Sequence, residues 1–357
     1  MKPKLTINIK PINSFAIGSV MALALCLGVF SAPLSLAKPP AASDPQTAVD
    51  AAYAKFKNVT EGKNADYIPA LAKVDPNLYG IAIITADGKV TTAGDVKTEV
   101  AIESISKVFT LARVIQDQGP EHIEKTLGVD ATGMAFNSVT AIEYAEHVRG
   151  GPTLNPFVNP GAITTTSMVQ GNTADEVWAK IIGTYNDFAG RPLSVMEDVY
   201  KSESDTNEHN RAIALLMQSY GYIKSDSNAL QATDIYTRQC SVGVNARDLA
   251  TMAATLANGG KNPVTGKRVM DEANVPEVLA VMATAGLYEN SGEWLYDTGL
   301  PAKSGVGGGI IAVSPGKFGI AVVSPPLDKA GNSVRAQRSI TAISNDLGGN
   351  PLAATAK

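Results

Sequence analysis

The sequence predicts an α+β fold, in which an antiparallel sheet is flanked by helices and a mostly helical region is inserted between its strands. Three observations lead to this fold class. One β-hairpin pattern lies near the N-terminus, a second lies near the C-terminus, and the segment between them is rich in helical patterns. Because an isolated hairpin is marginally stable, we expect the two hairpins to share one sheet.

The first hairpin is predicted from segments 79–86 and 89–94, which alternate apolar and small residues on either side of Asp87-Gly88. Asp-Gly between two such segments is typical of a type I′ turn. Farther along the chain, 211–220 and 246–257 have the apolar spacing of helices. They belong to the inserted helical region.

The second hairpin is predicted from segments 309–314 and 317–324, which flank Pro315-Gly316. A helical pattern runs from 333 to 346. These elements complete the expected sheet and place a helix after it.

The N-terminus has the pattern of a cleaved secretory signal peptide. Lys2, Lys4 and Lys10 form a basic start, residues 15–30 form an apolar run, and Ser35-Leu36-Ala37 has the small residues of a cleavage site. We therefore expect residues 1–37 to be removed and the protein to be periplasmic or secreted.

A membrane anchor is the alternative interpretation of this N-terminus. The apolar run is short for a bilayer span and Pro33 interrupts its end, while the bulky Leu25 before Cys26 disfavours lipid attachment. We therefore expect no stable membrane anchor after cleavage. Residues 38–51, rich in Pro, Ala and Ser, are predicted to be a mobile arm, and 52–350 to form a single domain.

Removing residues 1–37 takes away three lysines and no acidic residue, which leaves 27 Lys and Arg against 34 Asp and Glu, a net charge of −7. Such a chain lacks the basic surface that nucleic acids require. Cys240 is then the only cysteine, so no intramolecular disulfide can form. His122, His147 and His209 are far apart and lack metal-ligand spacing, so we expect no metal site.

Two short motifs indicate acyl-transfer chemistry. Ser104-Ile105-Ser106-Lys107 places a serine and a lysine three residues apart, and Lys303-Ser304-Gly305 follows late in the chain on a predicted strand. On a helix the serine and lysine share a face, and a desolvated lysine can deprotonate the serine hydroxyl. The same helix would bury its apolar residues Val108, Leu111 and Ile115 in a core.

Together with other segments in the same order, these motifs resemble the serine-dependent glutaminase family of the β-lactamase and penicillin-binding-protein superfamily. The matching segments are 65–69, 104–109, 155–163, 202–203 with Asn210, 234–241, 252–260, 299–306 and 324–329. The resemblance implies a β-lactamase-like fold and hydrolysis of the side-chain amide of L-glutamine, giving L-glutamate and ammonia, with no cofactor. It also implies a homo-oligomer.

The resemblance assigns the chemistry to five residues. Ser104 would be the nucleophile, and its backbone N–H together with that of Val306 would bind the oxyanion. Lys107, alone or with Tyr288, would take the hydroxyl proton, and Tyr236 would donate a proton to the departing ammonia. A γ-glutamyl ester on the serine would then be hydrolysed by water.

The resemblance also implies how glutamine is held. Glu203 would bind the α-ammonium, while Asn159, Tyr67 and Asn210 would fix the α-carboxylate end of the substrate. The complete substrate site would comprise Tyr67, Ser104, Asn159, Glu203, Asn210, Tyr236, Tyr288 and Val306.

Two residues depart from the family pattern. Glu103 stands where glutamine is usual, and an extra carboxylate near Lys107 would raise the pKa of that lysine and oppose its role as a neutral base. Pro160 replaces the usual alanine, and a proline restricts the preceding Asn159 to extended conformations. Neither change removes a catalytic group.

Two other functions are compatible with parts of the pattern. A penicillin-binding or β-lactamase-type hydrolase would share the Ser-x-x-Lys motif and export, but no Ser-Asp-Asn element is placed as in those enzymes. A non-catalytic amino-acid-binding protein would use Glu203 and Asn159 to capture its ligand. It would have no need of Ser104 beside Lys107.

Overall fold

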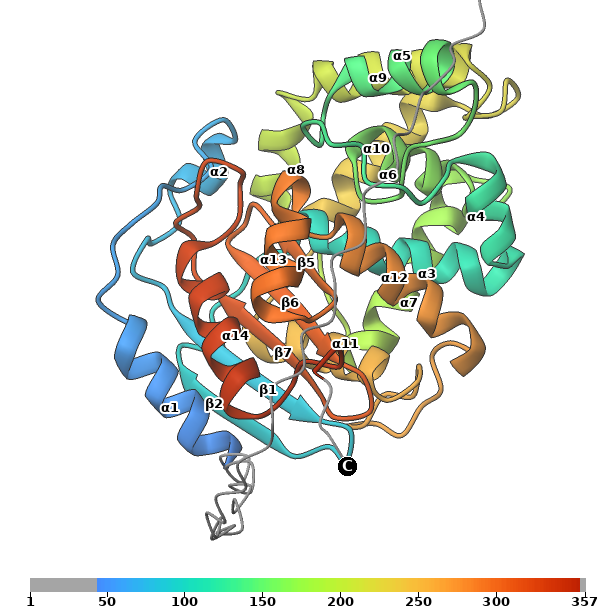
Figure 1. Ribbon diagram of the computed structural model, residues 1–357. Coiled ribbons are helices and arrows are strands. Elements are labelled where there is room, and N and C mark those ends of the chain that lie inside the picture. The colour runs from blue at the N-terminus through green and yellow to red at the C-terminus, as the bar shows by residue number, and fades with distance from the viewer. Residues whose placement is uncertain (1–43, 354–357) are drawn as a thin grey trace, which may run out of the picture. The chain divides into compact units, whose positions relative to one another are not determined.

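Five antiparallel strands form the central sheet, in the order β2-β1-β7-β6-β5 (Figure 1). The computed structural model describes residues 44–353, which belong to one compact unit. The strands are β1 Gly80–Thr85, β2 Val90–Gly94, β5 Ala302–Gly305, β6 Gly309–Ser314 and β7 Phe318–Val323. Because β1 pairs with β7, the N-terminal and C-terminal hairpins share one sheet, as predicted.

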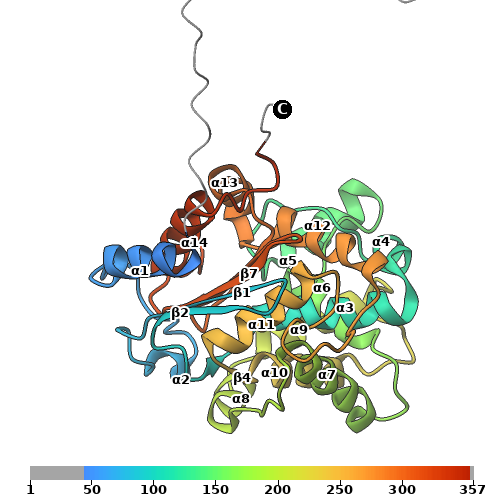
Figure 2. The same ribbon diagram turned by 90° about the horizontal axis from the view of Figure 1, so that it is seen from below.

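Both faces of this sheet are buried. In β1, Ile81 and Ile83 pack into a cluster with residues of the terminal helices, whereas Ala82 and Ile84 face the opposite cluster. The first face is covered by α1 Pro45–Phe56, α13 Ser291–Thr298 and α14 Val334–Asp346. On the other face lies α11 Ala246–Ala257, with the helical region beyond it (Figures 1 and 2). The period-2 alternation of a strand thus separates two apolar cores.

Close packing of α11 on the sheet depends on a glycine in β7. A Cβ at Gly319 would lie 2.1 Å from the backbone nitrogen of Ala254, so no larger residue fits without moving the helix. The helix begins with a capping box, in which the side chains of Asn245 and Asp248 accept hydrogen bonds from each other's backbone N–H groups.

The remaining helices lie in the region inserted between the hairpins, except for the short helix Pro69–Ala72, which precedes β1. They are α2 Pro69–Ala72, α3 Ser106–Gln118, α4 Pro120–Thr126, α5 Val139–Tyr144, η2 Ala145–Arg149, α6 Asn159–Ser167, α7 Ala174–Ala189, α8 Glu197–Ser204, α9 Glu208–Ser219, α10 Ala229–Cys240 and α12 Val275–Ala285, with short turns η1 Glu103–Ile105, η3 Glu272–Asn274 and η4 Tyr288–Asn290. The predicted helices at 211–220, 246–257 and 333–346 are confirmed as α9, α11 and α14. Within residues 44–353, no helix combines the length and apolar character needed to cross a bilayer.

Two expectations about the N-terminal part are wrong. The turn at Asp87-Gly88 is not type I′, because only Gly88 has positive φ (85°). The N–H of Gly88 donates to the carbonyl of Thr85, which instead indicates a type I turn followed by a left-handed glycine. The arm predicted for 38–51 is helical from Pro45 on, because Asp44 caps α1 and Val49 is fully buried against the sheet; residues 38–43 lie outside the described range.

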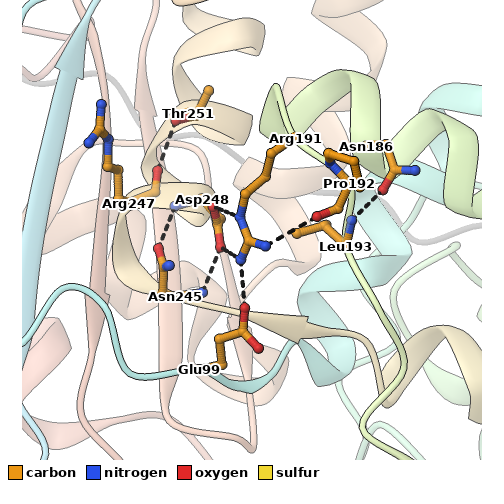
Figure 3. A network of polar contacts seen from close by, with 9 residues as sticks. All are labelled: Glu99, Asn186, Arg191, Pro192, Leu193, Asn245, Arg247, Asp248 and Thr251. Atoms are coloured by element: carbon orange, nitrogen blue, oxygen red, sulfur yellow. Dashed lines mark hydrogen bonds and ion pairs between the residues drawn. The ribbon is translucent and has the colours of Figure 1, made fainter.

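A polar network holds the segment that leads into the Ser-x-x-Lys motif (Figure 3). Arg191, after α7, donates from Nε to Asp248 Oδ1 at 2.8 Å and from Nη2 to Glu99 Oε1 at 2.7 Å. Glu99 directly precedes β3 Val100–Ala101, which pairs with β4 Gly243–Val244. The network therefore joins three chain segments immediately before Ser104.

Candidate active site

Ser104 is held in a single 3-10 turn, η1, at the junction between β3 and α3. The turn runs directly into α3, so Ser104 and Lys107 keep the three-residue spacing of a helical face, as predicted. Glu103 has a φ of +52°, a left-handed conformation that is uncommon for a residue with a side chain. Strain of this kind, of the order of 1 kcal/mol or more, persists only where surrounding packing enforces it.

Lys107 is buried and its amine is oriented by two acceptors. Nζ donates to the carbonyl oxygen of Phe157 at 3.0 Å and to Oδ1 of Asn159 at 2.8 Å. Burial lowers the pKa of Lys107 to about 8, although the nearby Cys240 and Glu103 act in the opposite direction. Desolvation therefore outweighs the acidic groups around Lys107, and the pKa of the lysine falls instead of rising as expected.

The end of β5 lies against η1. A Cβ at Gly305 would be 2.7 Å from the carbonyl oxygen of Ile102, so only glycine permits this approach. The contact brings Val306, the next residue, to the cavity that Ser104 also lines. The two backbone N–H groups assigned to the oxyanion thus come from segments that pack on each other.

Asn159 connects the catalytic and substrate-binding residues predicted from the sequence. Its Oδ1 accepts from Lys107 Nζ and from the hydroxyl of Tyr236 at 3.1 Å, and its Nδ2 donates to Oδ1 of Asn210 at 3.0 Å. The expectation that Pro160 keeps Asn159 extended is wrong, because Asn159 is the first residue of α6. Proline is tolerated in the first helical turn, where its missing N–H is not needed.

Seven of the predicted site residues line one cavity of about 240 Å³. They are Tyr67, Ser104, Asn159, Glu203, Asn210, Tyr236 and Val306. They come from a loop, η1, α6, α8, α9, α10 and the end of β5. The fold therefore gathers at one place residues that are up to 239 positions apart in the sequence.

Tyr288, the eighth predicted site residue, does not line this cavity but a smaller one of about 80 Å³, and Phe136 lines both. Its hydroxyl donates to the carbonyl oxygen of Ser304 at 3.5 Å, and its ring is 4.8 Å from that of Phe136. Like Glu103, Tyr288 has positive φ, at +54°. Burial raises the pKa of Tyr288 above its ordinary value, while hydrogen bonding with Ser104 opposes this rise. The hydroxyl group is therefore protonated at neutral pH.

Lys303 was part of a sequence motif but was not assigned a role in the site. Lys303 is fully buried on β5. Its Nζ donates to the carbonyl oxygen of Ser304 at 2.7 Å and lies 4.4 Å from the centre of the Tyr288 ring. Burial and the nearby Lys107 hold its pKa well below the ordinary value. The Lys-Ser-Gly motif was the signal by which this second buried amine could have been found.

Two acidic side chains, Glu103 and Glu203, meet on the cavity wall. Burial raises the pKa of Glu103 well above its ordinary value, and the adjacent Glu203 adds to this rise. Burial also raises the pKa of Glu203, to about 7, while hydrogen bonds from Glu103 and Ser241 oppose the change. The cavity wall therefore carries two carboxyl groups with raised pKa values, and both act on the buried amine of Lys107.

The fold and the site together define a class of protein. A five-stranded antiparallel sheet flanked by helices, with the Ser-x-x-Lys segment opening a buried helix beside the end of β5, constitutes a β-lactamase-like fold. The Glutaminase family model matches residues 62–350. The chain therefore belongs to the glutaminase family.

Individual relatives agree with this assignment. A glutaminase from Colwellia psychrerythraea strain 34H is 56% identical over 315 residues, which cover 88% of this chain and 99% of the relative. A solved structure described as a probable glutaminase ybaS has a TM-score of 0.83 and 49% identity, covering 86% of this chain and 98% of that one. A structure of Mglu in its glutamate form has a TM-score of 0.81 and 33% identity, covering 87% of this chain and 70% of that one.

Proposed function

We propose that this glutaminase hydrolyses L-glutamine through a γ-glutamyl ester on Ser104. The observation that carries the proposal is the buried Lys107, which lies on the helix that continues the turn holding Ser104 and whose pKa of about 8 leaves a useful fraction of neutral amine at physiological pH. A structural neighbour, Mglu, was solved in a glutamate form, and glutamate is the product expected here.

In the first half of the reaction, Ser104 attacks the side-chain amide carbon and Lys107 takes the hydroxyl proton. Tyr236, whose hydroxyl shares the Asn159 oxygen with Lys107, protonates the departing ammonia. Water then attacks the ester carbonyl and gives its proton to the Tyr236 oxygen. Lys107 returns its proton to Ser104 Oγ as the ester C–O bond breaks, and glutamate leaves. The N–H groups of Ser104 and Val306 stabilise both oxyanions, a contribution of roughly 3 kcal/mol per donor in comparable acyl-transfer sites.

Substrate selection rests on other polar side chains that line the same cavity. Glu203 binds the α-ammonium, and Asn159, Asn210 and Tyr67 bind the α-carboxylate by hydrogen bonds. The Asn159–Asn210 hydrogen bond supports this assignment, since it orients both amides along one wall of the cavity.

The test is to trap the ester. Acid quenching during turnover, followed by mass spectrometry of the peptide that contains Ser104, is expected to show the added mass of a γ-glutamyl group in wild type. Ser104→Ala is expected to bind glutamine, release no ammonia and show no adduct. Ammonia release by Ser104→Ala at the wild-type rate would refute the nucleophile assignment.

We further propose that residues 1–37 direct export to the periplasm or the medium and that the mature enzyme is a homo-oligomer. The signal-like sequence supports the first statement and the family resemblance supports the second. N-terminal sequencing of protein from the native host is expected to start after Ala37, and a start at Met1 would contradict export. Light scattering of the mature protein is expected to give a multiple of the chain mass.

A further inference from the structure

Two carboxyl groups share the cavity wall with no cationic partner. Glu103 is only 3% exposed, and Glu203 is partly buried beside it. In the part of the chain that the structure describes, neither forms an ion pair with a lysine, arginine or histidine. The nearest amine, Lys107, directs its protons to Phe157 and Asn159 instead. Two adjacent desolvated carboxylates cannot both remain ionised.

The surroundings of the two groups decide which of them keeps a proton. Both side chains line the same cavity and lie close enough to act on each other's pKa, and a hydrogen bond between two carboxyl groups requires that one of them be protonated. Glu203 also accepts from Ser241 Oγ at 3.4 Å, whereas Oε1 of Glu103 is buried without a hydrogen-bond partner among residues 44–353. A buried carboxylate with an unpaired oxygen costs more than a neutral acid in the same place. The proton therefore belongs to Glu103.

We propose that Glu103 is a positioning residue for substrate recognition: it remains a neutral acid, donates its proton in a hydrogen bond to Glu203, and holds that carboxylate ionised and aimed at the α-ammonium of glutamine. The inference rests on the proposed role of Glu203. It explains how an acidic residue is accommodated beside the nucleophile. As a neutral donor, Glu103 adds no negative charge next to Lys107.

Other ionisable groups also face Glu103. Lys107 on α3 is the only amine among the groups that act on the pKa of Glu103, and its positive charge favours the ionised form of Glu103. Burial and the adjacent Glu203 on α8 favour the neutral form of Glu103. Tyr236 and Cys240 on α10 are neutral, since burial raises the pKa of both. Tyr67 and Tyr288 complete the surroundings and are neutral, since desolvation and the neighbouring acidic groups raise the pKa of both. Burial and Glu203 outweigh Lys107, because the pKa of Glu103 is raised overall.

Two substitutions separate the effect of the proton from that of the side-chain volume. Glu103→Gln keeps a neutral hydrogen-bond donor, while Glu103→Met keeps an unbranched chain without a donor. Both are made in the Ser104→Ala background, and L-glutamine binding is measured by calorimetry from pH 6 to 9. The substrate ammonium titrates alike in all proteins, so the ratio of each Kd to that of Ser104→Ala reports only on the protein.

We expect Glu103→Gln to bind within about threefold of the parent at every pH. Glu103→Met is expected to bind on the order of tenfold more weakly at pH 6.5, the loss of a charge-assisted hydrogen bond. Without the donor, the pKa of Glu203 rises, and its carboxylate is present only above that raised pKa. The ratio of the Kd of Glu103→Met to the Kd of Ser104→Ala should therefore return toward 1 as the pH increases. A deficit that stays constant with pH would show a structural role and overturn the proposal.

A kinetic measurement with Ser104 intact tests the charge state independently. If Glu103 is neutral, Glu103→Gln leaves the acid limb of the kcat profile where it is in wild type. If Glu103 were ionised, its removal would lower the pKa of Lys107 and move the limb to lower pH, which would overturn the proposal. Glu121→Gln, an exposed residue of α4, is the matched control.

The ammonium assignment is tested separately by Glu203→Gln in the Ser104→Ala background. If that variant binds glutamine as tightly as its parent, the role proposed for Glu203 fails, whatever Glu103 does. If it binds weakly while both Glu103 variants bind normally, the role of Glu203 stands and that of Glu103 is refuted.

Discussion

Replacing Asn159 by aspartate tests the role of Lys107 as the base, because it changes the charge beside the amine while keeping the side-chain size. Oδ1 of Asn159 lies 2.8 Å from Nζ of Lys107. A carboxylate at that distance stabilises the ammonium form, and such a neighbour shifts a pKa by about 1 to 3 units. Starting from about 8, the pKa of Lys107 should rise to roughly 9 or above.

The direction of the change in rate depends on which protonation state of Lys107 is active. Only the neutral amine can accept the serine proton, and it is present above the pKa. Raising the pKa by 1 to 2 units lowers the neutral fraction at pH 8 by about 5-fold to 50-fold, and the rate should fall accordingly. At pH well above the new pKa, the Asn159→Asp enzyme should approach the wild-type rate.

The assay is pre-steady-state ammonia release from pH 6 to 11 at saturating glutamine, which reports on the enzyme–substrate complex. Saturation matters because the introduced carboxylate also repels the substrate α-carboxylate and should raise KM. Asn228→Asp is the matched control, since it places the same charge at the exposed cap of α10, where aspartate caps equally well. An acid limb at the same pH in wild type and Asn159→Asp would refute Lys107 as the titrating base.

Three further outcomes are expected. Lys107→Ala should lose nearly as much activity as Ser104→Ala, and the rate of the double variant should be no lower than that of either single variant, because the two residues act as one unit. A much slower double variant would contradict this. Glu203→Gln should reduce kcat/KM for glutamine by about tenfold or more and leave N-acetylglutamine, which has no ammonium, unaffected; equal losses on both substrates would remove the ammonium assignment. Arg191→Ala should lower the free energy of unfolding by about 2 kcal/mol, because it leaves the buried Asp248 without its ion-pair partner, while Arg191 itself is partly solvated. Denaturant titration measures this change. An unchanged free energy of unfolding would show that the network in Figure 3 does not stabilise the protein.

The sequence by itself determined the strands, several helices and the identity of the reacting groups. Apolar alternation is a local property, so both hairpins and the helix 246–257 could be located from it. The Ser-x-x-Lys spacing likewise specifies its own geometry, because residues three apart on a helix are neighbours. The family resemblance added the cavity residues, seven of which the structure brings together.

The start of α1 was missed although Asp44 followed by Pro45 is a local helix-start signal, and a tertiary contact then stabilises the helix. Residues 45–51 are rich in small residues, yet they are helical because Val49 packs against the sheet. Asn159 is helical despite the following proline, because α6 begins there. Local preferences amount to about 1 kcal/mol or less per residue, and burial of one side chain exceeds that.

The protonation states in the site also depend on the tertiary structure. Sequence indicated that Glu103 would raise the pKa of Lys107, but burial lowers it to about 8. Whether Glu103 carries a charge depends on Glu203, which is 100 positions away in the chain and adjacent to it in the fold. Desolvation and through-space charge depend on where a residue lies in the folded protein. The sequence therefore identified the reacting residues, whereas their packing determines their protonation states.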